Sequence, residues 1–349
     1  MRVRVGILKP DHLGDLILSA PAITTLRRRF DNPILFCHPR NLPLASDLFP
    51  GLRTSPIQLP HLDKERSSRA QSGQLLSLLR GKIDTLICLR WDLASERLLT
   101  TPEIEYHTPG PSYIDRHVAV EQHELVARFT GPYDILSAYT YAECAPSPAR
   151  PSQPKAVGLC IAAGFRLNAW PVCHWQELAQ RLHRHGTRIV LIGGPTEVQK
   201  LRILDQSLRG ALGYRPRVII GTPDFAATLR CFAQEVDLVV ATDSGAGHLA
   251  ALVRPVVSLF GGSPWRRFAP LGRHNLILSR RYPCSPCPQF TRTVVNACHT
   301  QECLVNLQPL QVYHCLTAYL AGLDFSQELE MDGVWMSQAP WQEQQAAAA

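Results

Sequence analysis

An aspartate follows the first apolar segment of the chain, at a position where a carboxylate could do chemistry. The stretch LKPDHLGDLILSAPA, residues 8–22, begins as a buried strand, breaks at polar residues and then resumes as an apolar helical pattern. Gly14 in this break allows a tight turn of the backbone, and Asp15 lies at or just before a helix start. Asp15 is therefore either a helix N-cap or a carboxylate free for another role, and Ser19 is an equally good cap for a helix that starts later.

A glycine-rich loop in the second half of the chain has the composition of an anion site. A β-branched segment ends at Thr242, the loop follows, and a short helix is predicted to open at His248. Backbone N–H groups in such a turn at a helix N-terminus bind phosphate. The candidate ligand-binding residues of this loop are Asp243, Ser244, Gly245, Ala246, Gly247 and His248. Asp243 is either a cap or a partner for a ligand hydroxyl, and His248 could equally be a buried, satisfied histidine.

Two other loops follow predicted strands and contain arginine beside small residues. In IAAGFRLNAWP, residues 161–171, Ala163 and Gly164 permit close approach of a ligand, and Arg166 offers a bidentate fork to a phosphate. The alternative is a plain loop with a solvated arginine. In LFGGSPWRRFAPLG, Arg266 and Arg267 are as easily read as surface arginines as they are as ligand contacts.

These loops must be positioned by strands and helices, and both halves of the chain alternate short β-branched runs with helical patterns. This alternation predicts βαβ units and parallel sheets, an α/β fold. The predicted strands are Val3–Leu8, Ile34–Cys37, Thr85–Leu89, Ala156–Cys160, Arg188–Ile192, Val218–Ile220, Leu238–Ala241 and Val256–Phe260. The predicted helices are Ala22–Phe30, Gln74–Leu79, His117–Phe129, Trp175–His185, Glu197–Leu208, Phe225–Phe232, His248–Leu252 and Leu307–Leu320.

The length of 349 residues suits two domains. The proline-rich segment Cys144–Lys155 disfavours both helix and central strand, so we predict the interdomain linker there. The expected organisation is a Rossmann-like domain over 1–150, a second over 151–325, and a flexible tail over 326–349 that has little to bury.

The composition excludes several classes of protein. A formal charge of +7, from 36 basic and 29 acidic residues, comes without a long basic run or an aromatic-rich basic strip, so no nucleic-acid partner is expected. No signal-peptide core and no segment of membrane-spanning length is visible, which predicts a cytoplasmic protein whose eleven cysteines are mostly reduced thiols in cores. The dinucleotide, P-loop and G-x-S-x-G motifs are missing.

Four segments together resemble a known family. The segments ILKPDHLGDLILSAPAITTLRRRF, HVAVEQHELVARFTG, GFRLNAWPVCHWQELAQRL and TDSGAGHLAALVRPVVSLFG are similar to those of the ADP-heptose:lipopolysaccharide heptosyltransferases, glycosyltransferase family 9. The resemblance extends from about Met1 to Leu320. It implies a GT-B fold, in which two Rossmann-like domains face each other across a cleft, with the acceptor bound mainly by the N-terminal domain and the donor by the C-terminal domain.

The resemblance also implies a chemistry. Asp15 would be the general base of an inverting transfer of a heptose or related sugar from an ADP-sugar donor to a lipopolysaccharide-core or other glycan acceptor, with His12 and Gly14 on the acceptor side. The donor would contact the two loops that contain Ala163, Gly164, Arg166, Asn168 and Asp243, Ser244, Gly245, Ala246, Gly247, His248. No metal is needed for this step, and a lipid-borne acceptor implies peripheral contact with the cytoplasmic face of the inner membrane.

The sequence departs from the family at one residue of the donor loop. The family commonly has a lysine two residues before the Trp-Pro pair, where this chain has Asn168. Either Arg166 replaces the lost cation or the donor differs from ADP-heptose.

A cysteine group near the C-terminus leaves further alternatives open. Cys284, Cys287, Cys298 and Cys303, together with His299, could form a structural metal site, a disulfide or packed thiols. Starting from this group, the alternative function is a metal-bearing nucleic-acid binder. A third alternative is a relative that binds a nucleotide-sugar without turnover. Such a protein would not need a base at Asp15.

Overall fold

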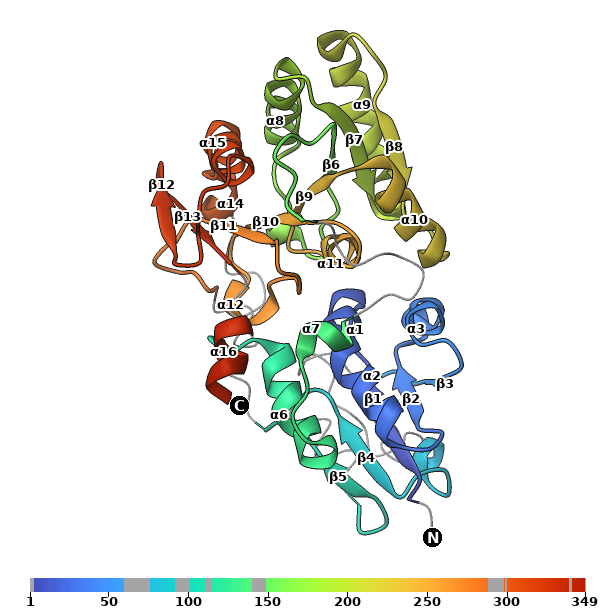
Figure 1. Cartoon of the computed structure of the whole chain (residues 1–349). Coiled ribbons are helices and arrows are strands. Elements are labelled where there is room, and N and C mark those ends of the chain that lie inside the picture. The colour runs from blue at the N-terminus through green and yellow to red at the C-terminus, as the bar shows by residue number, and fades with distance from the viewer. Residues whose placement is uncertain are drawn as a thin grey trace. The chain divides into compact units, whose positions relative to one another are not determined.

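The chain folds into two compact units, each built on its own sheet (Figure 1). The first contains residues Met1–Thr140 and Trp341–Ala349, and the second contains Tyr141–Pro340. The computed structural model describes residues 3–59, 76–91, 101–110, 114–139, 149–287, 298, 300–338 and 341–348.

The first unit is a parallel sheet with the strand order β3-β2-β1-β4-β5. Its strands are β1 (Val5–Lys9), β2 (Ile34–Cys37), β3 (Arg53–Pro56), β4 (Thr85–Cys88) and β5 (Glu105–His107). Its named helices are α1 (Leu13–Leu18), α2 (Ala20–Arg29), η1 (Pro39–Asn41), α3 (Leu42–Leu48), α6 (Val118–Thr130), α7 (Ile135–Ala138) and α16 (Trp341–Ala348). Every residue of β1, β2 and β4 is buried, as expected for a parallel sheet covered on both faces.

The second unit is a mixed sheet with the strand order β12-β13-β11-β10-β9-β6-β7-β8. Its strands are β6 (Ala156–Cys160), β7 (Arg188–Gly193), β8 (Arg217–Ile220), β9 (Leu238–Thr242), β10 (Val256–Phe260), β11 (Leu276–Ser279), β12 (Leu329–Met331) and β13 (Val334–Ser337). Its named helices are η2 (Arg166–Asn168), α8 (Val172–Arg184), η3 (Pro195–Glu197), α9 (Val198–Leu212), α10 (Phe225–Glu235), α11 (Gly245–Ala251), α12 (Trp265–Phe268), α14 (Glu302–Val305) and α15 (Pro309–Leu320). None of the helices in the described ranges is long and apolar enough to cross a membrane.

Most predicted elements are present, with shifted ends. The strands predicted at Ile34–Cys37, Ala156–Cys160 and Val256–Phe260 have those bounds. The helix predicted to open at His248 begins three residues earlier at Gly245, because the Ser244 side chain caps it. The helix predicted at Gln74–Leu79 is described only from residue 76 and is helical there.

The C-terminal segment differs from the predicted flexible tail over 326–349. β13 pairs antiparallel with β11, and β12 pairs with β13, so this segment extends the second sheet. The chain then returns to the first unit, where α16 packs on α6 and Trp341 is buried. The composition of the segment did not predict these elements, because a few apolar residues are enough to attach them to the two cores. Val334, Met336 and Trp341 are each almost fully buried. The observed boundary between units, after Thr140, also precedes the predicted one at 150.

Four of the ten described cysteines lie in the cores, fewer than the sequence predicted. Cys37, Cys88, Cys160 and Cys315 are buried, and every described cysteine is a free thiol. Burial raises the pKa of Cys37, Cys160 and Cys315 to about 12, so these thiols stay protonated and unreactive.

Candidate active site

Asp15 lies on α1, directly after β1, at the carboxyl edge of the first sheet. It is the third residue of the helix and is half-buried, while His12 occupies the N-cap position. Asp15 therefore does not cap the helix, and Gly14 has a helical backbone rather than forming the predicted tight turn. Ser19 makes no side-chain cap either, because its hydroxyl donates to the Asp15 carbonyl oxygen at 2.8 Å. Within the described residues, no protein group donates to the Asp15 carboxylate.

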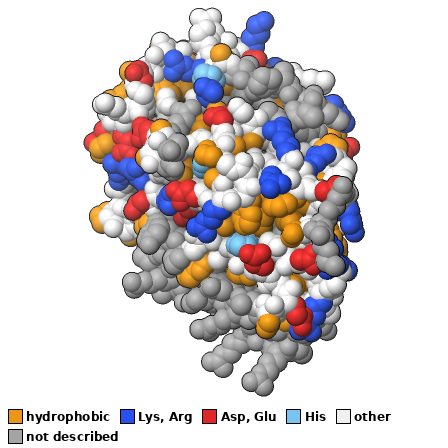
Figure 2. Space-filling view, turned by 60° about the horizontal axis from the view of Figure 1, so that its bottom comes forward, with side chains coloured by type: hydrophobic (Ala, Val, Ile, Leu, Met, Phe, Trp, Pro, Cys, Tyr) orange, Lys and Arg blue, Asp and Glu red, His pale blue; other side chains and the backbone are white. Residues whose placement is uncertain are grey.

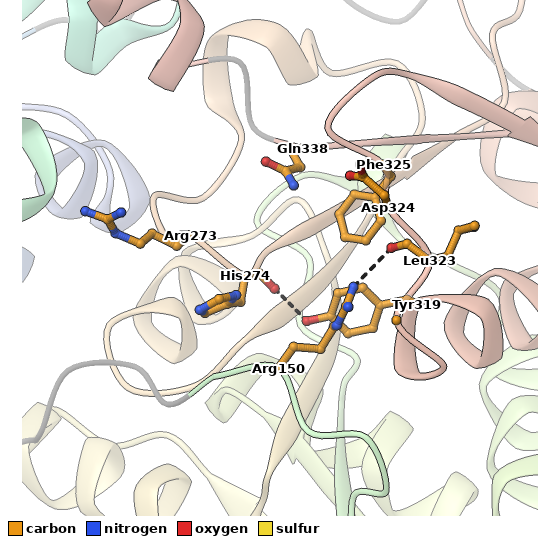
Figure 3. A pocket seen from close by; sticks show the side chains of 9 residues that line it. Arg150, Arg273, His274, Tyr319, Leu323, Asp324, Phe325 and Gln338 are labelled. Atoms are coloured by element: carbon orange, nitrogen blue, oxygen red, sulfur yellow. Dashed lines mark hydrogen bonds between the residues drawn. The ribbon is translucent and has the colours of Figure 1, made fainter.

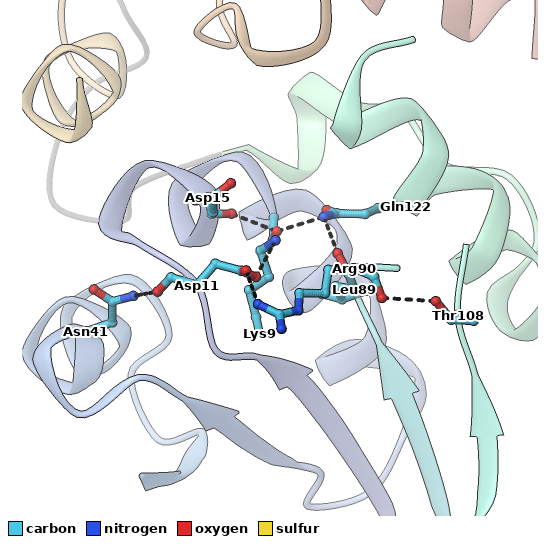
Figure 4. Close-up of polar contacts among 9 residues, drawn as sticks. Lys9, Asp11, Asp15, Asn41, Leu89, Arg90, Thr108 and Gln122 are labelled. Atoms are coloured by element: carbon cyan, nitrogen blue, oxygen red, sulfur yellow. Dashed lines mark hydrogen bonds and ion pairs between the residues drawn. The ribbon is translucent and has the colours of Figure 1, made fainter. Parts of the chain in front are cut away.

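A buried ionic cluster that the sequence did not predict lies beside this helix (Figure 4). One Asp11 carboxylate oxygen is 2.6 Å from Arg90 Nη1, and the other is 2.9 Å from Lys9 Nζ. The side chains of Lys9 and Asp11 are only 2% and 7% exposed. Asn41 Nδ2 also donates to the Asp11 carbonyl oxygen at 2.8 Å.

The charges of this cluster favour the ionised carboxylate. Burial alone raises the pKa of Asp11, but the charges of Lys9 and Arg90, with their hydrogen bonds, outweigh burial and hold that pKa far below its usual range. Nearby, burial, Arg40 and His12 together lower the pKa of His38. The edge that presents Asp15 therefore carries several cationic groups close to one buried carboxylate.

In the second unit, three loops leave the carboxyl ends of neighbouring parallel strands. Because β6, β9 and β10 are adjacent, the loops that follow Cys160, Thr242 and Phe260 meet at one edge. Thr242 Oγ1 donates to the Ala162 carbonyl oxygen at 3.0 Å and so joins the first two loops. This edge is where ligands of doubly wound sheets bind, and it contains the whole set of predicted donor residues.

Asn168 joins these loops through hydrogen bonds of its side chain. Its Nδ2 donates to Asp243 Oδ2 at 3.1 Å and to the Asp243 carbonyl oxygen at 3.3 Å, while its Oδ1 accepts from Ser263 Oγ at 3.1 Å. The side chain is buried. The amide is thus committed within the protein, and Asn168 is a brace between loops where the sequence had suggested a donor contact.

The glycine-rich loop opens α11 with its N-terminus at the same edge. Ser244 Oγ accepts from Gly247 N at 3.2 Å, so Ser244 is the N-cap and Asp243 is not. The first N–H groups of the helix, those of Gly245 and Ala246, are part-exposed and have no intrahelical acceptor. His248 is 4% exposed, its Nε2 is 3.7 Å from Asp243 Oδ1, and its Nδ1 is buried without a hydrogen-bond partner among the described residues.

The remaining predicted contacts divide into accessible and engaged groups. Ala163 is part-exposed and Gly164 is exposed, as close approach of a ligand requires. Arg166 is exposed, and its Nη2 donates to the Cys298 carbonyl oxygen at 3.3 Å. Arg266 pairs with Glu328 at 2.5 Å and lies over the Trp265 ring, which supports the structural alternative for that arginine.

Asn168→Ala is expected to lower the free energy of unfolding of the second unit by about 1–3 kcal/mol, because Asp243 and Ser263 lose their buried partner. Hydrogen exchange of β9 amides at increasing denaturant measures this loss. Gln206→Ala, which removes an exposed amide from α9, is the control and should leave the value unchanged. Equal stability of Asn168→Ala and the control would show that Asn168 does not brace the loops.

The cysteine group lies next to these loops. Burial and then the proximity of Cys284, Cys298 and Cys287 raise the pKa of Cys303 to about 11. Cys287 N donates to the Gly262 carbonyl oxygen at 2.7 Å. In the described part of the chain, no group of three His, Cys, Asp or Glu side chains is arranged to hold a metal ion, and His299 lies outside that part.

A cavity of about 350 Å³ elsewhere in the second unit contains none of the predicted residues (Figure 3). Arg150 and His274, which line it, precede β6 and β11, so the cavity is at the amino edge of the sheet, opposite the loops described above. Arg150 stacks over the Tyr319 and Phe325 rings and donates to the Leu323 carbonyl oxygen at 3.1 Å. The Arg273 side chain points away from these groups (Figure 3).

Comparisons with known proteins identify the family of this chain. A family model described as glycosyltransferase family 9 (heptosyltransferase) matches residues 90–297. Lipopolysaccharide heptosyltransferase 1 of Pseudomonas aeruginosa is 30% identical over 125 residues, which are 36% of this chain and 34% of that protein. Lipooligosaccharide heptosyltransferase 2 of Campylobacter jejuni is 20% identical over 325 residues, covering 89% of this chain and 96% of that protein.

A solved structure extends the likeness to the fold. The E. coli heptosyltransferase WaaC with ADP-2-deoxy-2-fluoro heptose has a TM-score of 0.59 and 19% identity, and the match covers 90% of this chain and 98% of that one. The fold is therefore GT-B, as the resemblance implied. Since the family model also spans more than half of its residues, the chain belongs to glycosyltransferase family 9, the heptosyltransferase family, and is a glycosyltransferase.

Proposed function

We propose that this chain transfers a heptose or related sugar from an ADP-activated donor to a lipopolysaccharide-type acceptor, with inversion at the anomeric carbon and Asp15 as general base. The observation that carries this proposal is the placement of Asp15. Its carboxylate is half-buried on a short helix at the carboxyl edge of the first sheet, and no described protein group donates to it. A carboxylate without such a partner is available to accept a proton from a sugar hydroxyl.

The chemistry is a single displacement. An acceptor hydroxyl oxygen forms a bond to the anomeric carbon of the donor as the bond from that carbon to the diphosphate oxygen breaks. The hydroxyl proton passes to Asp15, and ADP leaves with the electron pair of the broken bond. The anomeric centre has oxocarbenium character during this step, so a nearby carboxylate also stabilises it.

The second unit supplies the groups for the departing diphosphate. The N–H groups of Gly245 and Ala246, which have no intrahelical acceptor at the positive end of α11, suit a phosphate oxygen. His248 Nδ1 is buried and has no hydrogen-bond partner among the described residues. Arg166 is exposed in the loop that follows β6, the strand next to β9, and adds a positive charge at this edge.

The names of the relatives support the proposed acceptor. The relative from Pseudomonas aeruginosa is named for lipopolysaccharide, and a similar solved structure contains a fluorinated ADP-heptose. For a lipid-borne acceptor we propose peripheral contact with the cytoplasmic face of the inner membrane. The nucleic-acid alternative has less support, since Lys and Arg side chains are interspersed with Asp and Glu on the face shown in Figure 2.

A second donor remains in competition because of Asn168. Asn168 is neutral, so this position of the donor loop carries no positive charge, and its amide is hydrogen-bonded to Asp243 and Ser263. A glycosyltransferase that uses a different nucleotide-sugar is the function that this observation favours next.

Calorimetric titration of the purified protein with ADP-heptose, ADP, UDP, GDP and a short DNA duplex tests the proposal. Tightest binding of ADP-heptose is the expected result. Preference for UDP or GDP would replace the donor while keeping the transferase, and binding of DNA alone would overturn the proposal.

His248→Ala is expected to weaken ADP binding up to about tenfold, since a buried hydrogen bond contributes roughly 0.5–1.5 kcal/mol. Calorimetry measures the dissociation constant. The control is His314→Ala. This change removes an exposed imidazole of α15 that pairs with Asp332 and lies outside the predicted donor loops. An unchanged dissociation constant in His248→Ala would remove this residue from the donor site.

A further inference from the structure

Helix α1 is too short to define its own position. It has six residues, its N-cap residue His12 makes no side-chain cap, and isolated helices of this length do not form in water. Leu16, Ile17 and Leu18 bury its apolar face. Apolar burial is not directional, so the polar contacts at the two ends of the helix add directional constraints on the position of Asp15.

The first contact lies before the helix. The Asp11 carboxylate bridges Lys9, the last residue of β1, and Arg90, which follows β4. Asn41 holds the Asp11 carbonyl oxygen from η1. The segment between β1 and α1 is thus tied to both strands.

The second contact is made at the other end of α1. Ser19 Oγ donates to the Asp15 carbonyl oxygen at 2.8 Å and accepts from Gln122 Nε2 of α6 at 2.9 Å. The same Gln122 nitrogen donates to the Leu89 carbonyl oxygen at 2.8 Å. Ser19 and Gln122 are fully buried, so neither can touch a substrate.

The two contacts end on consecutive residues, Leu89 and Arg90 (Figure 4). We infer that Asp11 and the Ser19–Gln122 pair are positioning residues that hold α1, and with it the Asp15 carboxylate, against the end of β4. The inference rests on the proposed role of Asp15 as base. Its consequence is that kcat depends on buried groups that do not contact the substrate.

Ser19→Ala and Gln122→Met test this inference because they remove polar contacts with little change of volume. We expect each variant to lower kcat by about 10- to 100-fold, since a displacement of roughly 1 Å can cost about 10²-fold. Donor affinity by calorimetry should stay unchanged with full stoichiometry, because the donor loops lie in the second unit. The double variant should be no worse than either single one, since the two residues form one link.

Thr25→Val is the matched control. Its hydroxyl donates to the carbonyl oxygen four residues earlier, as that of Ser19 does, but this bond lies within α2. Wild-type kcat in Ser19→Ala and Gln122→Met, with a slowed Asp15→Asn, would overturn the inference and leave the base intact. Wild-type kcat in Asp15→Asn would instead overturn the base. The anchoring would then be judged by hydrogen exchange of residues 13–19, where unchanged protection in both variants refutes it.

Discussion

Asp15→Asn is expected to lower kcat by about two to four orders of magnitude, the usual cost of losing a general base. The amide keeps the size of the carboxylate but cannot take the proton from the acceptor hydroxyl. Since no described group donates to this carboxylate, the substitution breaks no hydrogen bond of the first unit, and the protein should keep its stability. Single-turnover measurements with saturating donor report the chemical step directly.

Asp31→Asn is the matched control for this substitution. Asp31 is exposed and precedes β2, so it lies at the amino edge of the same sheet. It should leave kcat at the wild-type value, and both variants should bind ADP as the wild type does. If Asp15→Asn turned over like Asp31→Asn, the base would have to be sought elsewhere, and the non-catalytic alternative would regain weight.

Asp11→Asn is expected to lower the free energy of unfolding of the first unit by about 3–5 kcal/mol, the cost of leaving a buried charge without its partner. Lys9 would remain buried without its Asp11 partner, and Arg90 would lose its ion pair with Asp11. Hydrogen exchange of β1 amides at increasing denaturant measures this loss. Adding Lys9→Met removes the buried Lys9 charge that has lost its partner, so the double variant should recover part of the stability. A double variant less stable than Asp11→Asn would contradict the ionic account.

The contribution of Asp11 should also depend on pH. Its folded-state pKa lies below the unfolded value of about 3.9, so the folded state binds fewer protons at this site. The stabilisation is therefore fully present above the unfolded pKa and is lost as the pH falls through the folded pKa. The difference in stability between wild type and Asp11→Asn should shrink below about pH 4. A difference that stays constant during acidification would show that Asp11 acts through packing alone.

Contiguous motifs carried most of the functional prediction. Asp15 and the loop residues 161–168 and 243–248 each follow a strand that the β-branched runs predicted, so their place at the carboxyl edges needed no knowledge of long-range packing. Helix ends were predicted less well. Caps depend on one side-chain bond, and Ser244 rather than Asp243 makes that bond before α11.

The roles of individual side chains depended on partners distant in the chain. Asn168 suggested a donor contact because its position in the loop is that of a family lysine, but Ser263, 95 residues away, turns it into a brace. The sequence did not predict the ion pair of Asp11, because its partner Arg90 follows β4, 79 residues later in the chain. α16 belongs to the first unit although more than 200 residues separate Gln344 from its partner His117.

Sequence patterns alone thus predicted the α/β class, the two-unit organisation and the family, because periodicity and strand-end motifs are local properties. The tertiary structure decided which of the described polar side chains form hydrogen bonds or ion pairs with other residues and which do not. Asp15 remains available, whereas Asn168, Ser244 and Asp11 are engaged. The physical reason is that a buried polar group must find a partner, and strand order, which brings distant residues to one edge, determines which partner it finds.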